Sequence, residues 1–590
     1  MLKNYLKIAL RNFWRHKGYT LINCLGLAIG ISCCLIALLY IGHEVSYDRF
    51  HEHSDRIYRL YSMQRRADGV RYSAGMSMPI GPAVAAEIPG CERVARLISG
   101  NGTLQYRDRT LTESIRFTDP DFFRIFSFPL REGDASTALQ EMNSVVLSEE
   151  TARKYFGDAD AIGKRLSIRL HEDFEDFIVT GVAAPVPKTS SIDFKVLLRF
   201  EKNPRYESSK DNWTDFNHSV YVRLAQGVDP VEVERLLMPF SEMHLANFIN
   251  YLGRFVDVAP ETGEVFRLSL QPISEIHFDT RIHQGRSRSP VYIFVLAIIA
   301  LMVLGSACIN FINLSVARAM TRMKEVGIRK VAGANRKQLL VQFWIETMLL
   351  SFLALAIGMV FCEQALPYFN RFTRLQLTMD FFASPYMLAA LLGLLLLTVL
   401  IAGTYPVLYI SRYRPVEIFS GQMRLGRTSY FRQGLVVFQF GLSILFIISA
   451  LVMSDQLVFL RSQNPGFNEE QVVVIPVMGQ KDGAKLLQLF KIKLSTESGV
   501  ASVTGASNNL GIGPEGSTFR SVSSFEYKGR QVNAHLLRID PAYLRTLTIS
   551  VVEGRAFREA VPGDRASILV NETLAAKLSE TASVVGLPLT

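Results

Sequence analysis

The sequence predicts a membrane protein, an α-helical transmembrane bundle of five spans that carries α+β domains outside the cytoplasm. Its 590 residues are 49% hydrophobic with a mean hydropathy of +0.18. That is too apolar for a soluble chain and too charged for membrane spans alone. Five apolar runs are each long enough to cross roughly 30 Å of hydrocarbon. The net charge of +10 is concentrated beside these runs, as in loops that stay cytoplasmic.

The expected parts follow one another along the chain with alternating sides of the membrane. They are a cytoplasmic amphipathic helix (1–20), the first span (21–42), an aqueous domain (43–288), the second span (289–317), a basic cytoplasmic segment (318–337), the third span (338–362), a short external loop (363–380), the fourth span (381–411), a second cytoplasmic loop (412–432), the fifth span (433–454) and an incomplete second aqueous domain (455–590).

The first twenty residues show the pattern of a helix lying in the membrane interface. Lys3, Lys7, Arg11 and Arg15 repeat every four residues on one face, opposite an apolar face. No acid precedes Glu44, so the N-terminus should be cytoplasmic and the first span should run outward. A cleaved signal peptide is the competing interpretation; the apolar run is longer than a usual signal core, which favours a retained anchor.

Residues 43–288 read as a mixed α+β domain large enough for its own core. Strands are predicted from Ile57, Ser144, Phe177 and Ser219, and helices at 80–87, 148–156 and 229–243, with Ser148 and Asp229 as N-caps. The Asn-Gly at Asn101 predicts a hairpin turn. The cluster of His43, His51 and His53 with Glu44 and Glu52 has no fixed metal-ligand spacing, and we interpret it as a solvated segment next to the membrane.

The basic segment 318–337 organises the chain. It holds seven Lys or Arg side chains and one acid, Glu325, so it should stay on the cytoplasmic side. Met323, Val326, Lys330 and Val331 fall at helical spacing. These features predict a short helix along the membrane face, of the kind that docks to a cytosolic partner.

This stretch also resembles a known family. KEVGIRKVAGA, residues 324–334, is similar to the cytoplasmic coupling helix of FtsX/MacB-like ABC-transporter permeases. The resemblance implies that the segment fits a groove on a separate ATPase subunit, through Lys324, Glu325, Val326, Gly327, Ile328, Arg329, Lys330, Gly333 and Ala334. It implies that 43–288 is a MacB-like periplasmic core domain. The second loop resembles the family too, in the Arg-Pro turn of Arg412, Arg414 and Pro415.

Glu346 is an ionisable residue inside the third span. Such a residue faces protein or water. We interpret it as a structural glutamate near the interface, and a role in transport is the alternative.

The tail repeats the first aqueous domain. Asp119-Pro120 aligns with Asp540-Pro541 and Gly133 with Gly554, both 421 residues apart. Ser148 aligns with Asn571 and Gly163 with Gly586, both 423 apart, and Phe50 aligns with Phe467 just after each span. This order indicates duplication. Since the second copy stops early, we expect a C-terminally truncated piece of a longer chain with two external domains and eight spans.

No catalytic chemistry is expected. GDADAIGK, residues 157–164, has the wrong spacing for a P-loop, and no catalytic elbow or metal motif appears, so we expect no enzyme and no cofactor, with ATP bound by the partner subunit. The resemblance implies a bacterial inner-membrane permease that exports or extracts a substrate by mechanotransmission. The alternative is a transmembrane signalling or scaffold protein that regulates a periplasmic partner.

The expected partners are a cytosolic ABC ATPase, the lipid bilayer and, externally, either an adaptor or a cell-wall enzyme. We expect a homodimer or pseudo-symmetric assembly and no nucleic acid.

Overall fold

The structure is a computed structural model, and it divides into two compact units, residues 1–46 with 289–463 and residues 47–288 with 464–590. It describes residues 2–590 apart from 67–68, 172, 255–264, 283–286, 332–335, 382–384, 412–429, 465, 469, 476, 478–482, 509–520, 529, 559–560, 580–582 and 589–590; in some helical stretches, 318–331 among them, it gives the backbone alone.

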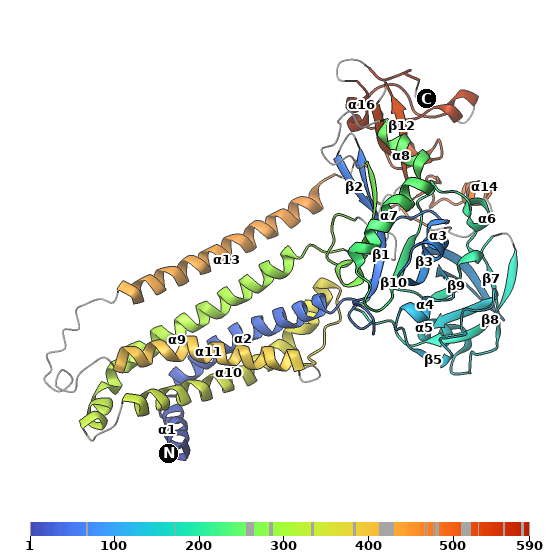
Figure 1. Cartoon of the computed structure of the whole chain (residues 1–590). Helices are drawn as coiled ribbons and strands as arrows, with labels where there is room; N and C mark the ends of the chain where they lie inside the picture. The colour runs from blue at the N-terminus through green and yellow to red at the C-terminus, as the bar shows by residue number, and fades with distance from the viewer. Residues whose placement is uncertain are drawn as a thin grey trace. The chain divides into compact units, whose positions relative to one another are not determined.

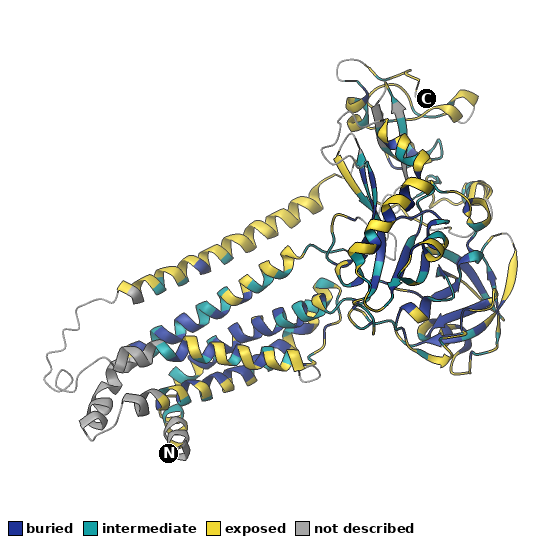
Figure 2. Ribbon diagram, in the orientation of Figure 1, coloured by how far each residue is buried: buried dark blue, intermediate teal, exposed yellow. Residues whose placement is uncertain are grey.

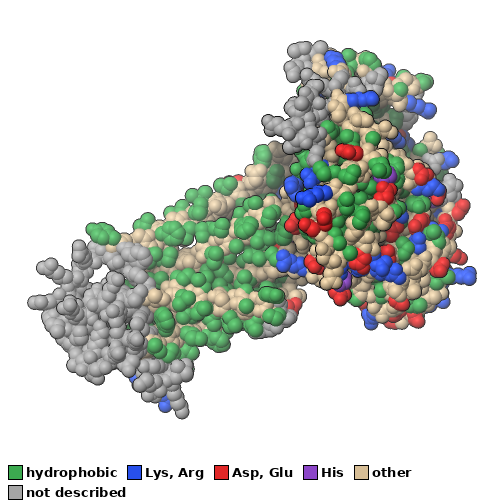
Figure 3. All heavy atoms as spheres, in the orientation of Figure 1, with side chains coloured by type: hydrophobic (Ala, Val, Ile, Leu, Met, Phe, Trp, Pro, Cys, Tyr) green, Lys and Arg blue, Asp and Glu red, His purple; other side chains and the backbone are tan. Residues whose placement is uncertain are grey.

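The first unit is a set of long helices (Figure 1). They are α1 (Leu2–Arg15), α2 (Lys17–Val45), α9 (Val291–Val331), α10 (Arg336–Thr373), α11 (Pro385–Ser411) and α13 (Tyr430–Ser462). All but α1 contain a stretch long and apolar enough to cross a membrane. In the view of Figure 3 their described surface is largely hydrophobic, whereas Lys, Arg, Asp and Glu side chains are scattered over the surface of the second unit.

The helix α2 lies at the centre of this unit, in contact with α9, α10 and α11. Leu27, Ile31 and Leu35 are fully buried on it. Gly30 lets α9 approach closely, since a Cβ there would lie 3.0 Å from the Cβ of Ala307. Such small residues drive helix association in lipid, where burial of apolar surface adds little. By contrast, α13 is exposed along most of its length (Figure 2).

Several helices extend further than hydropathy predicts. The expected interface helix 1–20 ends at Arg15, and residues 17–20 already belong to α2. The third span continues as α10 to Thr373, well into the predicted loop 363–380, and the fifth continues as α13 to Ser462. Apolar composition marks the bilayer, but backbone hydrogen bonding lets a helix continue beyond it.

The second unit begins with the first aqueous domain, residues 47–288, built on a mixed sheet. The described strands are β1 (Ile57–Arg66), β2 (Gly69–Ser73), β3 (Cys91–Tyr106), β4 (Arg109–Thr118), β5 (Leu130–Gly133), β6 (Ser144–Ser148), β7 (Arg165–Arg169), β8 (Phe174–Ala183), β9 (Val196–Arg199), β10 (Ser219–Leu224) and β11 (Phe266–Pro272). The main path runs β11-β1-β10-β3-β4-β9-β6-β8-β5. The pairs β4–β9 and β6–β8 are parallel and the others antiparallel, which gives the α+β class that composition predicts.

Helices cover this sheet and bury three apolar clusters against it. They are α3 (Ile80–Glu87), α4 (Phe122–Ile125), α5 (Glu149–Phe156), α6 (Tyr206–Ser209), α7 (Pro230–His244), α8 (Ala246–Gly253) and the 3-10 turns η1 (Phe200–Lys202) and η2 (Ile273–Glu275). Ser148 caps α5 by accepting from the Thr151 N–H, and Asp229 caps α7 by accepting from the Val231 N–H, which satisfies N–H groups that a helix start leaves open.

The expected hairpin turn at Asn101 is wrong. Asn101 lies in the middle of β3, paired with Ser114, and the turn comes at Arg107, whose φ is 50°. Gly102 serves packing instead, because a Cβ there would lie 2.5 Å from the Ile115 side chain. The glycine that suggested a turn is therefore needed for close contact across the sheet.

The second aqueous domain, residues 464–590, repeats several backbone features of the first. Its described elements are α14 (Gly483–Leu494), β12 (Ser521–Tyr527), β13 (Arg530–Leu536), α15 (Tyr543–Thr546), η3 (Pro562–Ala566) and α16 (Glu572–Leu578). The short helix α15 lies 421 residues after α4. Asn571 caps α16 by accepting from the Leu574 N–H, 423 residues after the matching bond of Ser148.

The match extends to strained backbone. Gly133 and Gly554 have φ values of 93° and 87°, and a Cβ at Gly133 would lie 2.4 Å from the Thr180 carbonyl oxygen. The hairpin turns match as well: Arg107 lies over the Tyr106 ring at 5.3 Å, and Lys528 lies over Tyr527 at 5.2 Å. The correspondence of Arg107 with Lys528 has the same offset of 421 residues as the Asp-Pro motif.

Candidate coupling site

The basic segment is not a separate short helix. The described backbone of α9 is continuous from Val291 to Val331, so the second span and residues 318–331 form one helix. Lys324 to Lys330 lie on it. Gly333 and Ala334 fall within 332–335, outside the described residues. What the structure gives here is a helical backbone that joins the span to the segment without a break.

The second cytoplasmic loop follows α11, which ends at Ser411. Arg412, Arg414 and Pro415 belong to residues 412–429, outside the described part of the chain. The second predicted cytoplasmic segment is therefore located by the ends of α11 and α13 alone.

Glu346 lies on α10 and is 9% exposed. Its Oε1 accepts a hydrogen bond of 3.0 Å from the side-chain Nδ2 of Asn12 on α1. Phe13, the next residue on α1, packs against the apolar core of the helices. The contact favours the structural interpretation of Glu346, because it joins the interface helix to the third span nearly three turns after α10 begins at Arg336.

Polar and small residues hold the remaining helices together at this end. Tyr19 and Ser315 share a hydrogen bond of 2.7 Å between their hydroxyl groups. A Cβ at Gly26 would lie 3.7 Å from the Asn310 Nδ2, and one at Gly403 would contact Thr347 at 3.3 Å. The start of α10, which follows the basic segment, is thus packed against α1 and α11, and α9 against α2.

The prediction of a solvated cluster after the first span is wrong for His51 and Glu44, which are buried, whereas Glu52 is exposed. His51 is 2% exposed among the Phe50, Phe126 and Phe128 rings. Burial lowers the pKa of its imidazole to about 4. In the part of the chain that the structure describes, no three His, Cys, Asp or Glu side chains are placed to hold a metal. Sequence reasoning missed this burial because Phe126 and Phe128, which pack against His51, lie about 75 residues further along the chain.

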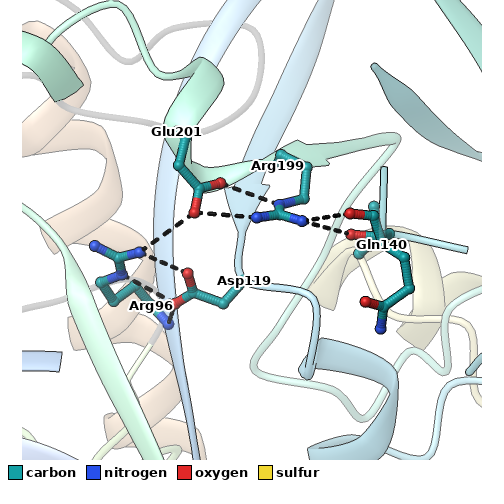
Figure 4. A network of polar contacts seen from close by, with 6 residues as sticks. Arg96, Asp119, Gln140, Arg199 and Glu201 are labelled. Carbon is teal, nitrogen blue, oxygen red and sulfur yellow. Dashed lines mark hydrogen bonds and ion pairs between the residues drawn. The ribbon is translucent and has the colours of Figure 1, made fainter. Parts of the chain in front are cut away.

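A buried charge network crosses the first aqueous domain (Figure 4). Arg96 on β3 is bonded to Asp119 at 2.7 Å and lies 3.9 Å from Glu201, which also pairs with Arg199 at 3.0 Å. Arg199 in turn donates to the Gln140 carbonyl oxygen at 2.6 Å. Because each charge has an opposite partner, the network is structural and offers no free group for catalysis. The second copy keeps the acid at Asp540, but its cation, Lys491, comes from α14 at 2.8 Å.

Two family models match the chain. The MacB-like periplasmic core domain matches residues 20–239 and the FtsX-like permease C-terminal region matches residues 297–415. The second match contains the basic segment and ends at Pro415, and the two matches together leave the second aqueous domain uncovered.

Curated relatives carry the name macrolide export ATP-binding/permease protein MacB. The one from Shewanella sp. (strain ANA-3) is 23% identical over 388 residues, which are 61% of this chain and 53% of the relative. The one from Pasteurella multocida (strain Pm70) is 21% identical over 426 residues, 70% of this chain and 59% of the relative. The chain spans about half the length of the curated relatives it matches.

Similar solved structures include a permease-protein domain from Porphyromonas gingivalis. It has 26% identity and a TM-score of 0.32, covering 38% of this chain and 91% of that one. The periplasmic region of MacB from Actinobacillus actinomycetemcomitans has 14% identity and a TM-score of 0.23, covering 36% of this chain and 87% of that one.

Proposed function

Because this chain belongs to the FtsX/MacB-like family of ABC-transporter permeases, we propose that it is the membrane subunit that couples ATP hydrolysis on a separate subunit to motion of its periplasmic domains. The observation that carries this proposal is α9, a continuous helix of 41 residues that contains both the second span and the coupling segment. At 1.5 Å per residue it is about 60 Å long, twice the hydrocarbon thickness. A push on its cytoplasmic end therefore reaches the periplasmic side without a flexible link.

The cytoplasmic end of α9 supplies the contacts to the ATPase. Glu325, Arg329 and Lys330 form polar contacts, and Gly327 and Gly333 allow the two backbones to approach closely. All five candidate spans cross the inner membrane, with the N-terminus in the cytoplasm, since the basic loops then lie inside. The bond between Asn12 and Glu346 keeps the interface helix against α10, which begins just after the coupling segment.

ATP binds to the partner and not to this chain. Residues 157–164, the one stretch with some likeness to a P-loop, lie in the aqueous domain next to α5. The work of the complex is export or extraction of a substrate by mechanotransmission, in which the periplasmic domains move and the cargo need not pass between the spans.

Affinity purification in mild detergent tests the proposal. We expect an ABC ATPase to co-purify with the full-length protein and to be lost when Gly327 is replaced by tryptophan, which blocks close approach. Gly305→Trp is the matched control on the same helix, because no side chain or backbone atom lies within 4 Å of a Cβ there. A preparation that lacks any ATPase but retains a periplasmic enzyme or regulator would instead establish the signalling or scaffold alternative.

A further inference from the structure

The residues that follow α2 and those that follow α13 are each held within the second unit by a hydrogen bond six residues after the helix end. Six residues after the end of α2, the Nδ1 of His51 accepts a hydrogen bond of 3.1 Å from the Ser127 N–H. Six residues after the end of α13, the Asn468 N–H donates a hydrogen bond of 2.9 Å to the Leu547 carbonyl oxygen. The spacing is equal although the residues that make the bonds differ.

The two loops that take part in these bonds, through the Ser127 N–H as donor and the Leu547 carbonyl oxygen as acceptor, are equivalent parts of the repeat. Ser127 lies two residues after the end of α4, and Leu547 directly follows α15. In the first copy a second bond forms, since the Glu52 N–H donates to the Ser127 Oγ at 2.9 Å. The Asp-Pro motif, the short helix and the loop after it therefore recur where each membrane helix is attached to its domain.

In the first copy the residues between α2 and His51, which we call the connector, are themselves held by contacts with the domain. Asp48 is fully buried with φ at 56°; its N–H donates to the Thr189 carbonyl oxygen at 2.8 Å and its Oδ1 accepts from the Ser191 N–H at 2.7 Å. Tyr47 stacks on His277 with the ring centroids 3.5 Å apart. The Arg288 N–H, at the entry to α9, donates to the His277 carbonyl oxygen at 2.8 Å. A connector held in this way transmits displacement and does not absorb it.

The surroundings of His51 favour a stable contact with the loop that contains Ser127. The ring fills an aromatic pocket made by Phe50, Phe126 and Phe128, so burial keeps the imidazole neutral and Nδ1 free to accept. The Nε2 then carries the proton. Both apolar packing and a hydrogen bond would have to be lost for the joint to open.

We propose that this exit joint, made by His51 and Glu52 on Ser127 in the first copy and by Asn468 on Leu547 in the second, is the element that passes motion of a membrane helix to its periplasmic domain. His51 and Ser127 are then positioning residues of the coupling mechanism. The proposal rests on the proposed function, because it assigns the place where movement of α2 enters the first domain.

The joint itself is tested by hydrogen exchange at the Ser127 amide in the full-length protein in detergent. His51→Leu keeps an apolar side chain but removes the acceptor, and we expect the exchange to become about tenfold faster or more. His51→Asn supplies an acceptor oxygen in place of Nδ1, using the residue that the second copy has there, and should restore slow exchange. Ser127→Ala, with Ser208→Ala as a surface control, gives a milder variant that removes only the acceptor for Glu52. An unchanged exchange rate at the Ser127 amide in His51→Leu would contradict the assignment of His51 to the exit joint.

The transmission role is tested in the complex with the ATPase, as the change in hydrogen exchange caused by ATP. We expect His51→Leu to keep the ATP-dependent change in α2 and to lose most of that in β1 to β11, and His51→Asn to keep both. A variant whose Ser127 amide exchanges fast while the domain still responds fully to ATP would overturn the inference and leave the proposed function standing. If the unaltered protein shows no ATP-dependent change, the proposed function fails and the transmission role fails with it, whatever the local exchange shows.

Discussion

Replacing Asp119 by alanine should destabilise the first periplasmic domain far more than replacing Asp121, two residues further along. The Asp119 carboxylate accepts three hydrogen bonds from one residue, Arg96: from its backbone N–H at 2.7 Å, from Nε at 3.0 Å and from Nη2 at 2.7 Å. Asp121 binds Arg93 at 2.9 Å and Arg124 at 3.2 Å. Both acids carry ion pairs, and they differ in burial.

The magnitude follows from what each change leaves behind. The Arg96 side chain is 7% exposed, and its guanidinium lies 4.0 Å from the Phe200 ring centroid. Since arginine cannot lose its proton, Asp119→Ala leaves a buried charge with only Glu201 nearby, at 3.9 Å. Breaking a buried pair in this way costs about 3–5 kcal/mol of unfolding free energy. Asp121 is 31% exposed, and loss of such a pair costs about 0–1 kcal/mol.

Urea unfolding followed by tryptophan fluorescence measures both variants. The chain has three tryptophans; Trp14 and Trp344 lie on membrane helices with exposed side chains, so Trp14→Phe with Trp344→Phe leaves Trp213 as the reporter. Trp213 stacks on His244 inside the domain, 4.4 Å between ring centroids. An Asp119→Ala loss below about 1 kcal/mol, or equal losses for Asp119→Ala and Asp121→Ala at an unchanged m-value, would refute the reasoning.

Three further predictions concern other parts of the chain. The pKa of His51 is lowered to about 4 in the folded domain, so as pH falls the unfolded chain takes up this proton before the folded chain does. The free energy of unfolding should therefore fall by up to about 3 kcal/mol between about pH 6.5 and pH 4. In His51→Asn, the free energy of unfolding measured in urea should depend less on pH across that range. Gly327→Trp should abolish stimulation of the partner's ATPase at normal expression, and unchanged stimulation would contradict the coupling assignment. Asn12→Ala and Glu346→Gln should be non-additive in detergent stability by about 0.5–2 kcal/mol; loss of transport with normal expression in Glu346→Gln would instead support a transport role.

Sequence reasoning succeeded where the signal is local. Ser148 and Asp229 cap helices because their side chains satisfy N–H groups two or three residues away, and this is visible in a short window. It failed for Asn101, because Asn-Gly predicts a turn only when nothing else needs the glycine. The need was set by Ile115 on β4 and by Leu170, which directly follows β7.

The exit joint could not be predicted for a related reason. His, Glu and Asp after a membrane span usually mean a solvated segment, and the partner that makes His51 an anchor, Ser127, lies 76 residues later. The comparison of the two copies in the structure locates the joint, through the spacing between each helix end and the hydrogen bond that follows it. The residues of the repeat revealed the Asp-Pro motif, but the equal spacing of six residues from each helix end to each bond appears only when the helix ends are known.

The two copies therefore retain geometry more strictly than side-chain identity. The carboxylate after the repeated strand is neutralised by Arg96 from a strand in one copy and by Lys491 from a helix in the other, and the exit joint uses a histidine side chain in one and a backbone N–H in the other. A substitution at these sites is tolerated if another element can still place the opposite charge or the hydrogen-bond partner at the same position.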